Sequence, residues 1–92
     1  MHQFRLYVAG VRPGTDRTIS ALQEALAQSL NGQYFLEVID VLEEPRAAER
    51  DAILATPTVM KLLPPPLTRV VGDLSQSEKL LRGLGVQAND VC

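Results

Sequence analysis

Apolar and polar residues alternate near the amino terminus and then change to helical spacing. A strand is predicted over residues 4–9, where apolar side chains take every second position. A helix is predicted next, because apolar residues recur every three or four positions at Ile19, Leu22, Leu26 and Leu30. Thr15 or Asp16 can cap the start of this helix, and Asn31-Gly32 tolerates the left-handed backbone that ends one.

The rest of the chain gives shorter segments separated by prolines and glycines. Strands are predicted over residues 34–41, 58–63 and 68–71, with the proline run 64–66 as a stiff connector. The strand 34–41 has apolar residues on both faces, so it is either covered on both sides or meets a partner. A second helix is predicted from Pro45 to about Leu54, where Thr56-Pro57 interrupts it. A last helix follows the capping box 75–78 and stops at Gly83 or Gly85.

This order of elements predicts an α/β fold: a right-handed βαβ unit, a second helix, a hairpin and a closing helix. A thioredoxin-like domain has this β-α-β-α-β-β-α order, and a ferredoxin-like fold is the main competitor. The Thr-Pro-Thr triplet at 56–58 is typical of the entry to the third thioredoxin strand, so we expect a cis Thr56–Pro57 bond. Residues 1–92 are expected to form a single domain, with 86–92 as a flexible tail.

Composition excludes several classes of function. The net charge is -2 and the arginines are scattered without a basic stripe, which argues against nucleic acid as a partner. No apolar run approaches the ~20 residues of a membrane helix, and no charged leader precedes an apolar stretch. Cys92 is the only cysteine, so an internal disulfide and a Cys-x-x-Cys pair are both excluded. We therefore expect a cytoplasmic protein that binds neither membranes nor nucleic acid.

The residues that carry most enzyme chemistry are scarce. His2 is the only histidine, so no Ser-His-Asp or Cys-His set can be assembled around it. The carboxylates of residues 43–51 are interleaved with Arg46 and Arg50, which is typical of a solvated helix face rather than a metal site. The loop Gly10–Gly14 precedes a helix whose first amides could bind an anion, but two glycines at this spacing are not a phosphate loop, and a plain connecting loop is the preferred interpretation. We predict no catalytic residue, no metal and no cofactor.

Five ordered segments resemble one known family. They are Leu6-Tyr-Val-Ala-Gly10, Val38-Ile-Asp-Val-Leu42, Ile53-Leu-Ala-Thr-Pro-Thr58, Leu63-Pro-Pro-Pro66 and Val71-Gly-Asp-Leu-Ser75. In these motifs, which span about residues 4–85, the chain resembles the KaiB family of circadian clock proteins. The amino-terminal sensor domain of the clock-output histidine kinase is similar to the first half, but it usually lacks the proline-rich and Gly-Asp-Leu-Ser segments.

The resemblance implies a non-catalytic regulator that changes fold. One state would be a homotetramer with a rearranged second half, and the other a thioredoxin-like monomer. The monomer would bind a KaiC-type ATPase ring, capture KaiA where the clock contains it, and compete with the output histidine kinase. The residues expected to govern the change of fold are Thr56, Pro57, Pro64, Pro65, Pro66, Gly83 and Gly85. The residues expected at the docking edge are Val38, Ile39, Asp40, Val41 and Glu43.

The chain departs from the family pattern at its short amino-terminal extension, where His2 stands at a position that is often aromatic in relatives, and in two further places. Glu43 and Glu44 stand where relatives commonly carry a basic residue, which either weakens the KaiC interface or implies a ring of altered charge. From Gly85 onward the chain lacks the acidic residue and the Leu-Leu-Tyr segment that help hold the tetramer, so we expect the monomer to be unusually populated. The alternatives are a thioredoxin-like oxidoreductase and a KaiC-binding sensor domain that does not change fold.

Overall fold

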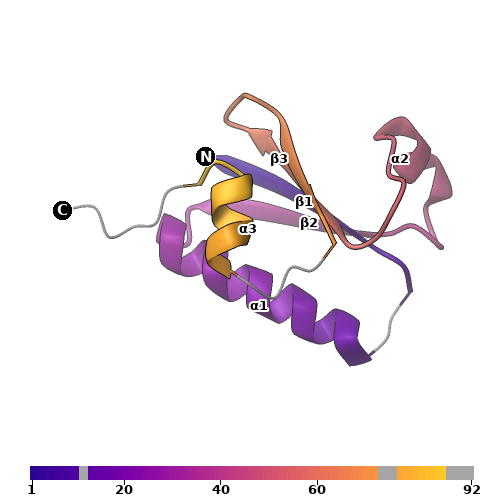
Figure 1. Cartoon of the computed structure of the whole chain (residues 1–92), viewed down its shortest axis with the longest axis horizontal. Helices are drawn as coiled ribbons and strands as arrows, with labels where there is room; N and C mark the ends of the chain where they lie inside the picture. Colours follow the sequence, from indigo (N-terminus) through magenta and orange to yellow (C-terminus); the bar gives the residue numbers. More distant parts are fainter. Residues whose placement is uncertain (11–12, 73–76, 87–92) are drawn as a thin grey trace.

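The computed structural model describes residues 1–10, 13–72 and 77–86. Its elements follow the predicted order (Figure 1). They are β1 (His2–Val8), α1 (Pro13–Leu30), β2 (Tyr34–Asp40), α2 (Pro45–Arg50), β3 (Thr58–Leu63), β4 (Thr68–Val71) and α3 (Ser77–Gly83). The predicted strands 58–63 and 68–71 are confirmed to the residue.

The strands form one mixed sheet in the order β2-β1-β3-β4. β1 pairs in parallel with β2 and antiparallel with β3, and β4 completes an antiparallel hairpin with β3. In this register Phe4 lies beside Leu36 on β2 and Lys61 on β3. β1 is therefore central, while β2 and β4 are the edges of the sheet.

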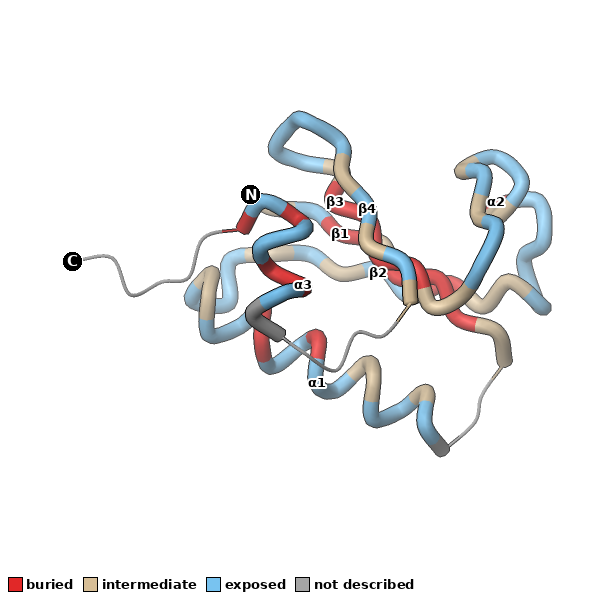
Figure 2. Tube along the Cα trace, in the orientation of Figure 1, coloured by how far each residue is buried: buried red, intermediate tan, exposed pale blue. Residues whose placement is uncertain are grey.

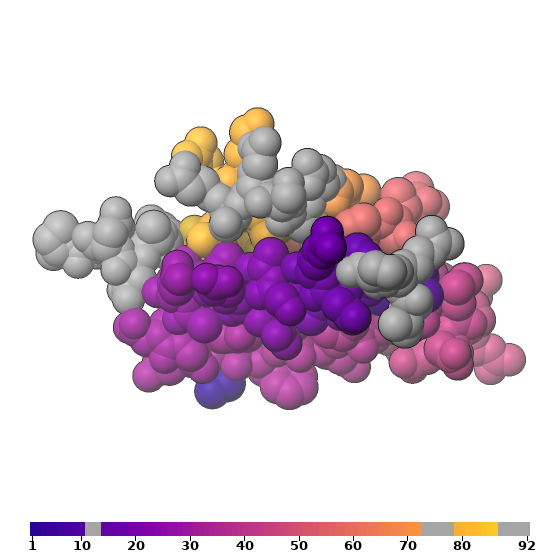
Figure 3. All heavy atoms as spheres, turned by 90° about the horizontal axis from the view of Figure 1, so that it is seen from below, coloured from indigo at the N-terminus to yellow at the C-terminus, as the bar shows by residue number. Residues whose placement is uncertain are grey.

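The two faces of the sheet are covered unequally. α1 and α3 pack on one face, and Figure 3 shows α1 running across the side of the molecule seen there. The large core lies under these two helices and comprises Phe4, Leu6, Val8, Leu22, Ala25, Leu26, Val59, Leu80, Leu81, Leu84 and Val86. The other face carries only a small cluster with α2, made of Tyr7, Ile39, Ala47 and Met60. Figure 2 shows buried residues concentrated on the central strands and on the inner sides of α1 and α3.

The first helix starts earlier than the sequence predicted. It begins at Pro13, so Thr15 and Asp16 lie inside its first turn and neither is its cap. The physical reason is that proline is preorganised for the first helical position and has no N–H to leave unpaired there. Residues 11–12, which precede it, and residues 73–76, which hold the first half of the predicted capping box 75–78, lie outside the described residues.

The second helix ends earlier than predicted, at Arg50 rather than near Leu54. Ala52 takes a left-handed conformation with a φ of 54°, which no helix can continue through. The N–H of Ala52 then donates to the carbonyl of Glu49 at 3.1 Å, and the N–H of Ile53 donates to that of Ala48 at 2.9 Å. This pair of bonds is the Schellman motif, here with alanine where glycine is usual.

The Thr56–Pro57 bond is cis, as the sequence predicted. Two further cis bonds, Leu63–Pro64 and Pro65–Pro66, lie in the loop between β3 and β4. Pro57 directly precedes β3, and its carbonyl accepts the N–H of Gly72 at 3.0 Å. The start of β3 and the end of β4 are thereby held together.

Candidate functional site

Strand β2 is an edge strand whose outer backbone has no strand beside it in the part of the chain that the structure describes. The N–H of Val41, just after the strand, donates to the carbonyl of Val8 at 2.8 Å. Because backbone groups alternate in direction along a strand, Leu36 and Val38 then direct their N–H and C=O groups away from β1. A partner strand could pair with these groups.

The side chains of this edge leave apolar surface exposed. Phe35 is 57% exposed, and Val38, on the opposite face, is 40% exposed. Leu42, in the turn that follows, is 69% exposed. Glu37, in the middle of the strand, is tied to β1, because its Oε1 accepts a hydrogen bond from Nε of Arg5 at 2.9 Å. The edge therefore combines unpaired backbone with exposed apolar side chains, which is the combination expected of a strand-pairing surface.

The predicted docking residues do not all point outward. Val38 and Glu43 are exposed. Ile39 is buried at 4% exposure in the small cluster with Tyr7, and Val41 is half-buried against the same cluster. The side chains of Ile39 and Val41 thus stabilise the fold, and by the same alternation their backbone N–H groups face β1, so the outward backbone of this edge belongs to Leu36 and Val38.

Asp40 fixes the chain where it leaves β2. Its Oδ1 accepts the N–H groups of Gly10 and Leu42, each at 2.9 Å. Its backbone carbonyl accepts the N–H groups of Glu43 at 3.1 Å and Glu44 at 2.9 Å. Asp40 therefore builds the turn that presents Leu42 and the two glutamates, while a direct contact with a partner stays a prediction.

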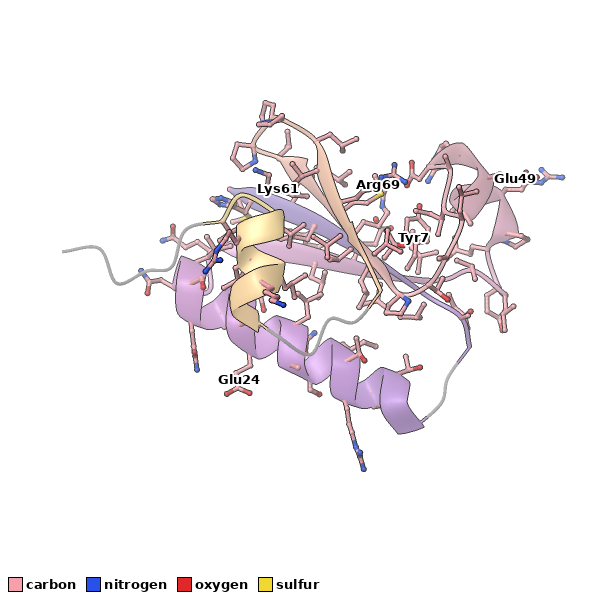
Figure 4. The ribbon with its side chains drawn as sticks, viewed as in Figure 1. Tyr7, Glu24, Glu49, Lys61 and Arg69 are labelled. Atoms are coloured by element: carbon pink, nitrogen blue, oxygen red, sulfur yellow. The ribbon has the colours of Figure 1, made fainter. Side chains whose placement is uncertain are left out.

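A polar network that sequence reasoning missed lies on the α2 side of the sheet. The buried Tyr7 hydroxyl hydrogen-bonds to the carboxylate of Asp51 and lies 3.1 Å from the carbonyl oxygen of Ala47 (Figure 4). Arg5 donates from Nη1 to Oδ2 of Asp51 at 2.9 Å, and from Nε to Glu37. Arg5 therefore links the edge strand β2 to the residue that follows α2. Because side chains alternate along β1, the sequence could predict that Arg5 and Tyr7 lie on the face opposite the large core. It holds no signal that pairs them with Asp51.

The network shifts the ionisation of its members. Burial by itself would raise the pKa of Asp51, but hydrogen bonds from Tyr7 and Arg5 and the charge of Arg5 outweigh it, so the pKa is lowered. Burial, followed by the hydrogen bond to Asp51, raises the pKa of Tyr7. The pKa of Arg5 is also raised, because its bonds to Glu37 and Asp51 outweigh its burial. Asp51 is thus held as a carboxylate between a cation and a neutral hydroxyl.

A cavity of about 390 Å³ lies beside Pro57, between the end of β1 and the start of α1. The residues that line it are Val8, Ala9, Gly14, Thr15, Thr18, Thr56 and Pro57. Thr15 Oγ1 is 3.4 Å from the carbonyl of Gly10, and Thr18 Oγ1 is 3.0 Å from that of Gly14. Neither hydroxyl has a base beside it within the described residues, so this cavity offers no activated nucleophile there.

The residues expected to govern a change of fold lie apart from one another in the second half of the chain. Thr56 and Pro57 precede β3, and the exposed prolines 64–66 form the loop between β3 and β4. Gly83 ends α3, and a Cβ placed on it would lie 2.8 Å from Cγ2 of Val70, so the helix packs closely on β4.

Gly85 completes the end of α3. Its φ is 74°, its N–H donates to the carbonyl of Arg82 at 3.1 Å, and the N–H of Val86 donates to that of Leu81 at 2.9 Å. A Cβ on Gly85 would also lie 3.3 Å from Nζ of Lys61, a residue labelled in Figure 4. The ammonium group therefore lies near the carboxyl end of α3, where the helix dipole favours a cation. Gly85 thus both ends the helix and makes room for this lysine.

Two further structural tests concern metals and membranes. No group of three His, Cys, Asp or Glu side chains among residues 1–10, 13–72 and 77–86 is placed to hold a metal ion. In the same ranges no helix has both the length and the apolar character needed to cross a bilayer.

Comparison with known proteins gives consistent matches over most of the chain. The family model described as KaiB domain matches residues 5–86. The circadian clock oscillator protein KaiB of Prochlorococcus marinus is 54% identical over 80 residues, which cover 87% of this chain and 76% of that protein. The protein of the same name from Trichodesmium erythraeum is also 54% identical over 80 residues, with 87% and 77% covered.

The solved structures that match identify the fold. The N-terminal domain of SasA from Synechococcus elongatus has a TM-score of 0.74 at 23% sequence identity, and the match covers 91% of this chain and 83% of that one. Mitochondrial thioredoxin 3 from Saccharomyces cerevisiae has a TM-score of 0.70 at 16% identity, with 91% and 76% covered. The thioredoxin-like fold predicted from the order of elements is thereby confirmed.

Proposed function

This chain belongs to the KaiB family, and from that premise we propose that it is a circadian clock regulator that acts by binding other proteins rather than by catalysis. The relatives that share 54% of their aligned residues with it are named circadian clock oscillator proteins. The only cysteine in the sequence is Cys92, and the cavity beside Pro57 is lined by threonines instead. Both observations support a binding role over thiol chemistry.

We further propose that its main partner is a KaiC-type ATPase ring, and that the thioredoxin-like monomer is the state that binds. The observation that carries this proposal is the β2 edge, where no described strand pairs with the outer backbone and where Phe35 and Val38 are exposed. An edge of this kind can recruit a second clock protein, such as KaiA, or exclude an output histidine kinase that uses the same ring. Glu43 and Glu44 beside this edge favour a ring whose facing surface is basic.

Fold switching is the proposed control over this binding. Pro57, the prolines 64–66, Gly83 and Gly85 border β3, β4 and α3. A change of backbone conformation at these residues would rearrange the second half of the chain and leave β1, α1 and β2 as they are. Two folds of one sequence need differ by only a few kcal/mol for a partner to shift the balance. Selective binding of the ring to one of them would supply that shift.

The test is co-elution with the KaiC ring of the same organism, in a phosphomimetic form with bound nucleotide. We expect a stable complex at micromolar concentrations. A charge-reversed Glu43→Lys/Glu44→Lys variant should bind more weakly if the ring presents a basic surface there, and more tightly if that surface is acidic. Failure of the unaltered protein to bind its cognate ring well into the micromolar range would contradict the proposed function.

A disulfide-exchange assay with insulin tests the alternative, a thioredoxin-like oxidoreductase. We expect no turnover above that of a Cys92→Ser variant. Activity that is present in the unaltered protein and lost in this variant would contradict a purely non-catalytic role.

A further inference from the structure

Helix α2 has a weak apolar attachment to the sheet. It is only 6 residues long, and Ala47 is its one buried residue. An isolated helix of this length is unstable in water, so its conformation depends on what it packs against. The apolar cluster beneath it is small, with Tyr7, Ile39 and Met60 as its other buried members. Apolar burial alone therefore gives α2 little of the stabilisation that α1 and α3 receive.

Polar contacts at the carboxyl end of α2 provide the additional attachment. The Asp51 carboxylate accepts hydrogen bonds from Tyr7 and Arg5 on β1. The guanidinium of Arg69 on β4 donates to the backbone carbonyls of Asp51 at 3.0 Å and Ala52 at 3.3 Å. We refer to Arg5, Tyr7, Asp51 and Arg69 as the clasp. It holds both the side chain and the backbone at one point, from two different strands.

The Schellman motif that ends α2 involves Asp51 and Ala52, the same residues that the clasp holds. The N–H groups of Asp51, Ala52 and Ile53 donate to the carbonyls of Ala47, Glu49 and Ala48 within α2 and its end. These bonds are local in sequence, whereas the contacts of the clasp join residues 17 to 46 positions apart. Loss of the clasp would therefore free α2 from the sheet without breaking any strand pairing.

From this arrangement we propose that residues 44–55 open from the sheet as a unit when the clasp breaks, while the four-stranded sheet stays folded under α1 and α3. Segments with few buried apolar contacts and a localised polar attachment open at a lower free energy than the whole domain. The open state exposes the cluster around Tyr7 and Met60 and removes the link between β2 and α2. The clasp is thus a conformational device that sets how often this face of the sheet is uncovered.

Amide hydrogen exchange of the whole protein tests the proposal, with the amides of Asp51, Ala52 and Ile53 as reporters and those of β1 and β3 as the reference. In the unaltered protein, rising but sub-denaturing urea should accelerate the reporters only slightly, because a local opening exposes little surface. The reference amides should follow a steep urea dependence. Reporters that follow the same steep dependence would overturn the proposal, since α2 would then open only when the domain unfolds.

A Tyr7→Phe variant tests the clasp itself, because it removes one hydroxyl and keeps the ring. We expect the protection of the reporters to fall about tenfold and that of the reference amides to change less than twofold. Glu49→Gln is the matched control: it neutralises a carboxylate on an exposed side chain of the same helix and leaves the clasp intact. Equal losses at reporters and reference in Tyr7→Phe, or an equal effect of Glu49→Gln on the reporters, would contradict a role for the clasp.

Discussion

Ala52 has a backbone conformation that is unfavourable for a residue with a Cβ atom. It is left-handed at a φ of 54°, where an L-residue with a Cβ is disfavoured and glycine is not. We predict that Ala52→Gly stabilises the domain by roughly 0.5–1 kcal/mol, because relief of strain exceeds the added freedom of the unfolded chain. Urea unfolding monitored by circular dichroism measures the change.

Ala48→Gly is the control for this prediction, since Ala48 lies within α2. Glycine inside a helix is disfavoured relative to alanine, so this variant should be less stable by up to about 1 kcal/mol. Opposite signs at these two positions would confirm that α2 ends where the structure places its end. Loss of stability in both variants would contradict it.

Asp51 should make stability depend on acid. Its pKa is lowered in the folded state, so its contribution is fully present above its unfolded pKa of about 3.9 and is lost as the pH falls through the folded value. We predict that Asp51→Asn costs about 1–3 kcal/mol at pH 7 and much less at pH 2.5, because the carboxyl is then protonated in both states. Unfolding free energies of both proteins at the two pH values test this, and a difference that does not change with pH would contradict it.

The sequence indicated individual residues only where local chemistry determines their role. Pro57 follows threonine at the start of an apolar strand, and this local context was enough to predict its cis bond. Asp51 looked like one more carboxylate on a charged helix, because its partners Arg5 and Tyr7 lie more than forty residues away. Ile39 was predicted at a docking edge, although its side chain is buried, because the residues that bury it, such as Tyr7 and Met60, also lie far away in the sequence.

At the scale of elements, β2 offers a test that separates backbone pairing from side-chain contact. The N–H of Val38 points away from β1, so a proline there removes no bond within the sheet. We predict that Val38→Pro destabilises the fold by only about 1 kcal/mol yet abolishes the binding of any partner that adds a strand at this edge. Binding by isothermal titration and stability by urea unfolding are the measurements.

Val38→Thr is the companion variant, because it makes the exposed side chain more polar and keeps the N–H. It should bind within a few-fold of the unaltered protein if backbone pairing dominates. If Val38→Pro binds normally, partners do not extend the sheet at β2. If the two variants lose binding equally, the apolar side chain matters more than the backbone.

The order of the elements was predictable because strands and helices differ in the period of their apolar positions, and glycines and prolines separate them. Their ends were less predictable where tertiary contacts decide them. α2 stops at Arg50 although no glycine or proline stands between it and Pro57, since the clasp holds Asp51 and the chain reverses at Ala52. The face that α2 covers also depends on the pairing of β1 with β3, which no local pattern specifies.

At the scale of the whole molecule, the described fold predicts a definite solution behaviour. We expect backbone chemical shifts to report strands at 58–63 and 68–71 and a helix over 77–83. We also expect sedimentation of a monomer near 10.1 kDa at micromolar concentration. A tetramer whose second half gives different secondary shifts would show that the other fold dominates. Two sets of signals in exchange would show that both are populated.

The central place of β1 also bears on how the chain is made. β1 is synthesised before β2 and β3; it pairs in parallel with β2, and its other side pairs with β3. A nascent chain that has emerged only as far as α2 therefore exposes one whole side of its central strand, with no β3 to cover it. Ribosome pausing in that interval would lengthen the exposure, and an internal start that omitted β1 would leave β2 and the β3–β4 hairpin with nothing to join. Because the ribosome makes the chain from its amino end, β1 can be paired on both sides only after β3 has been synthesised. The sheet is therefore completed by β3 and not by the first half of the chain alone.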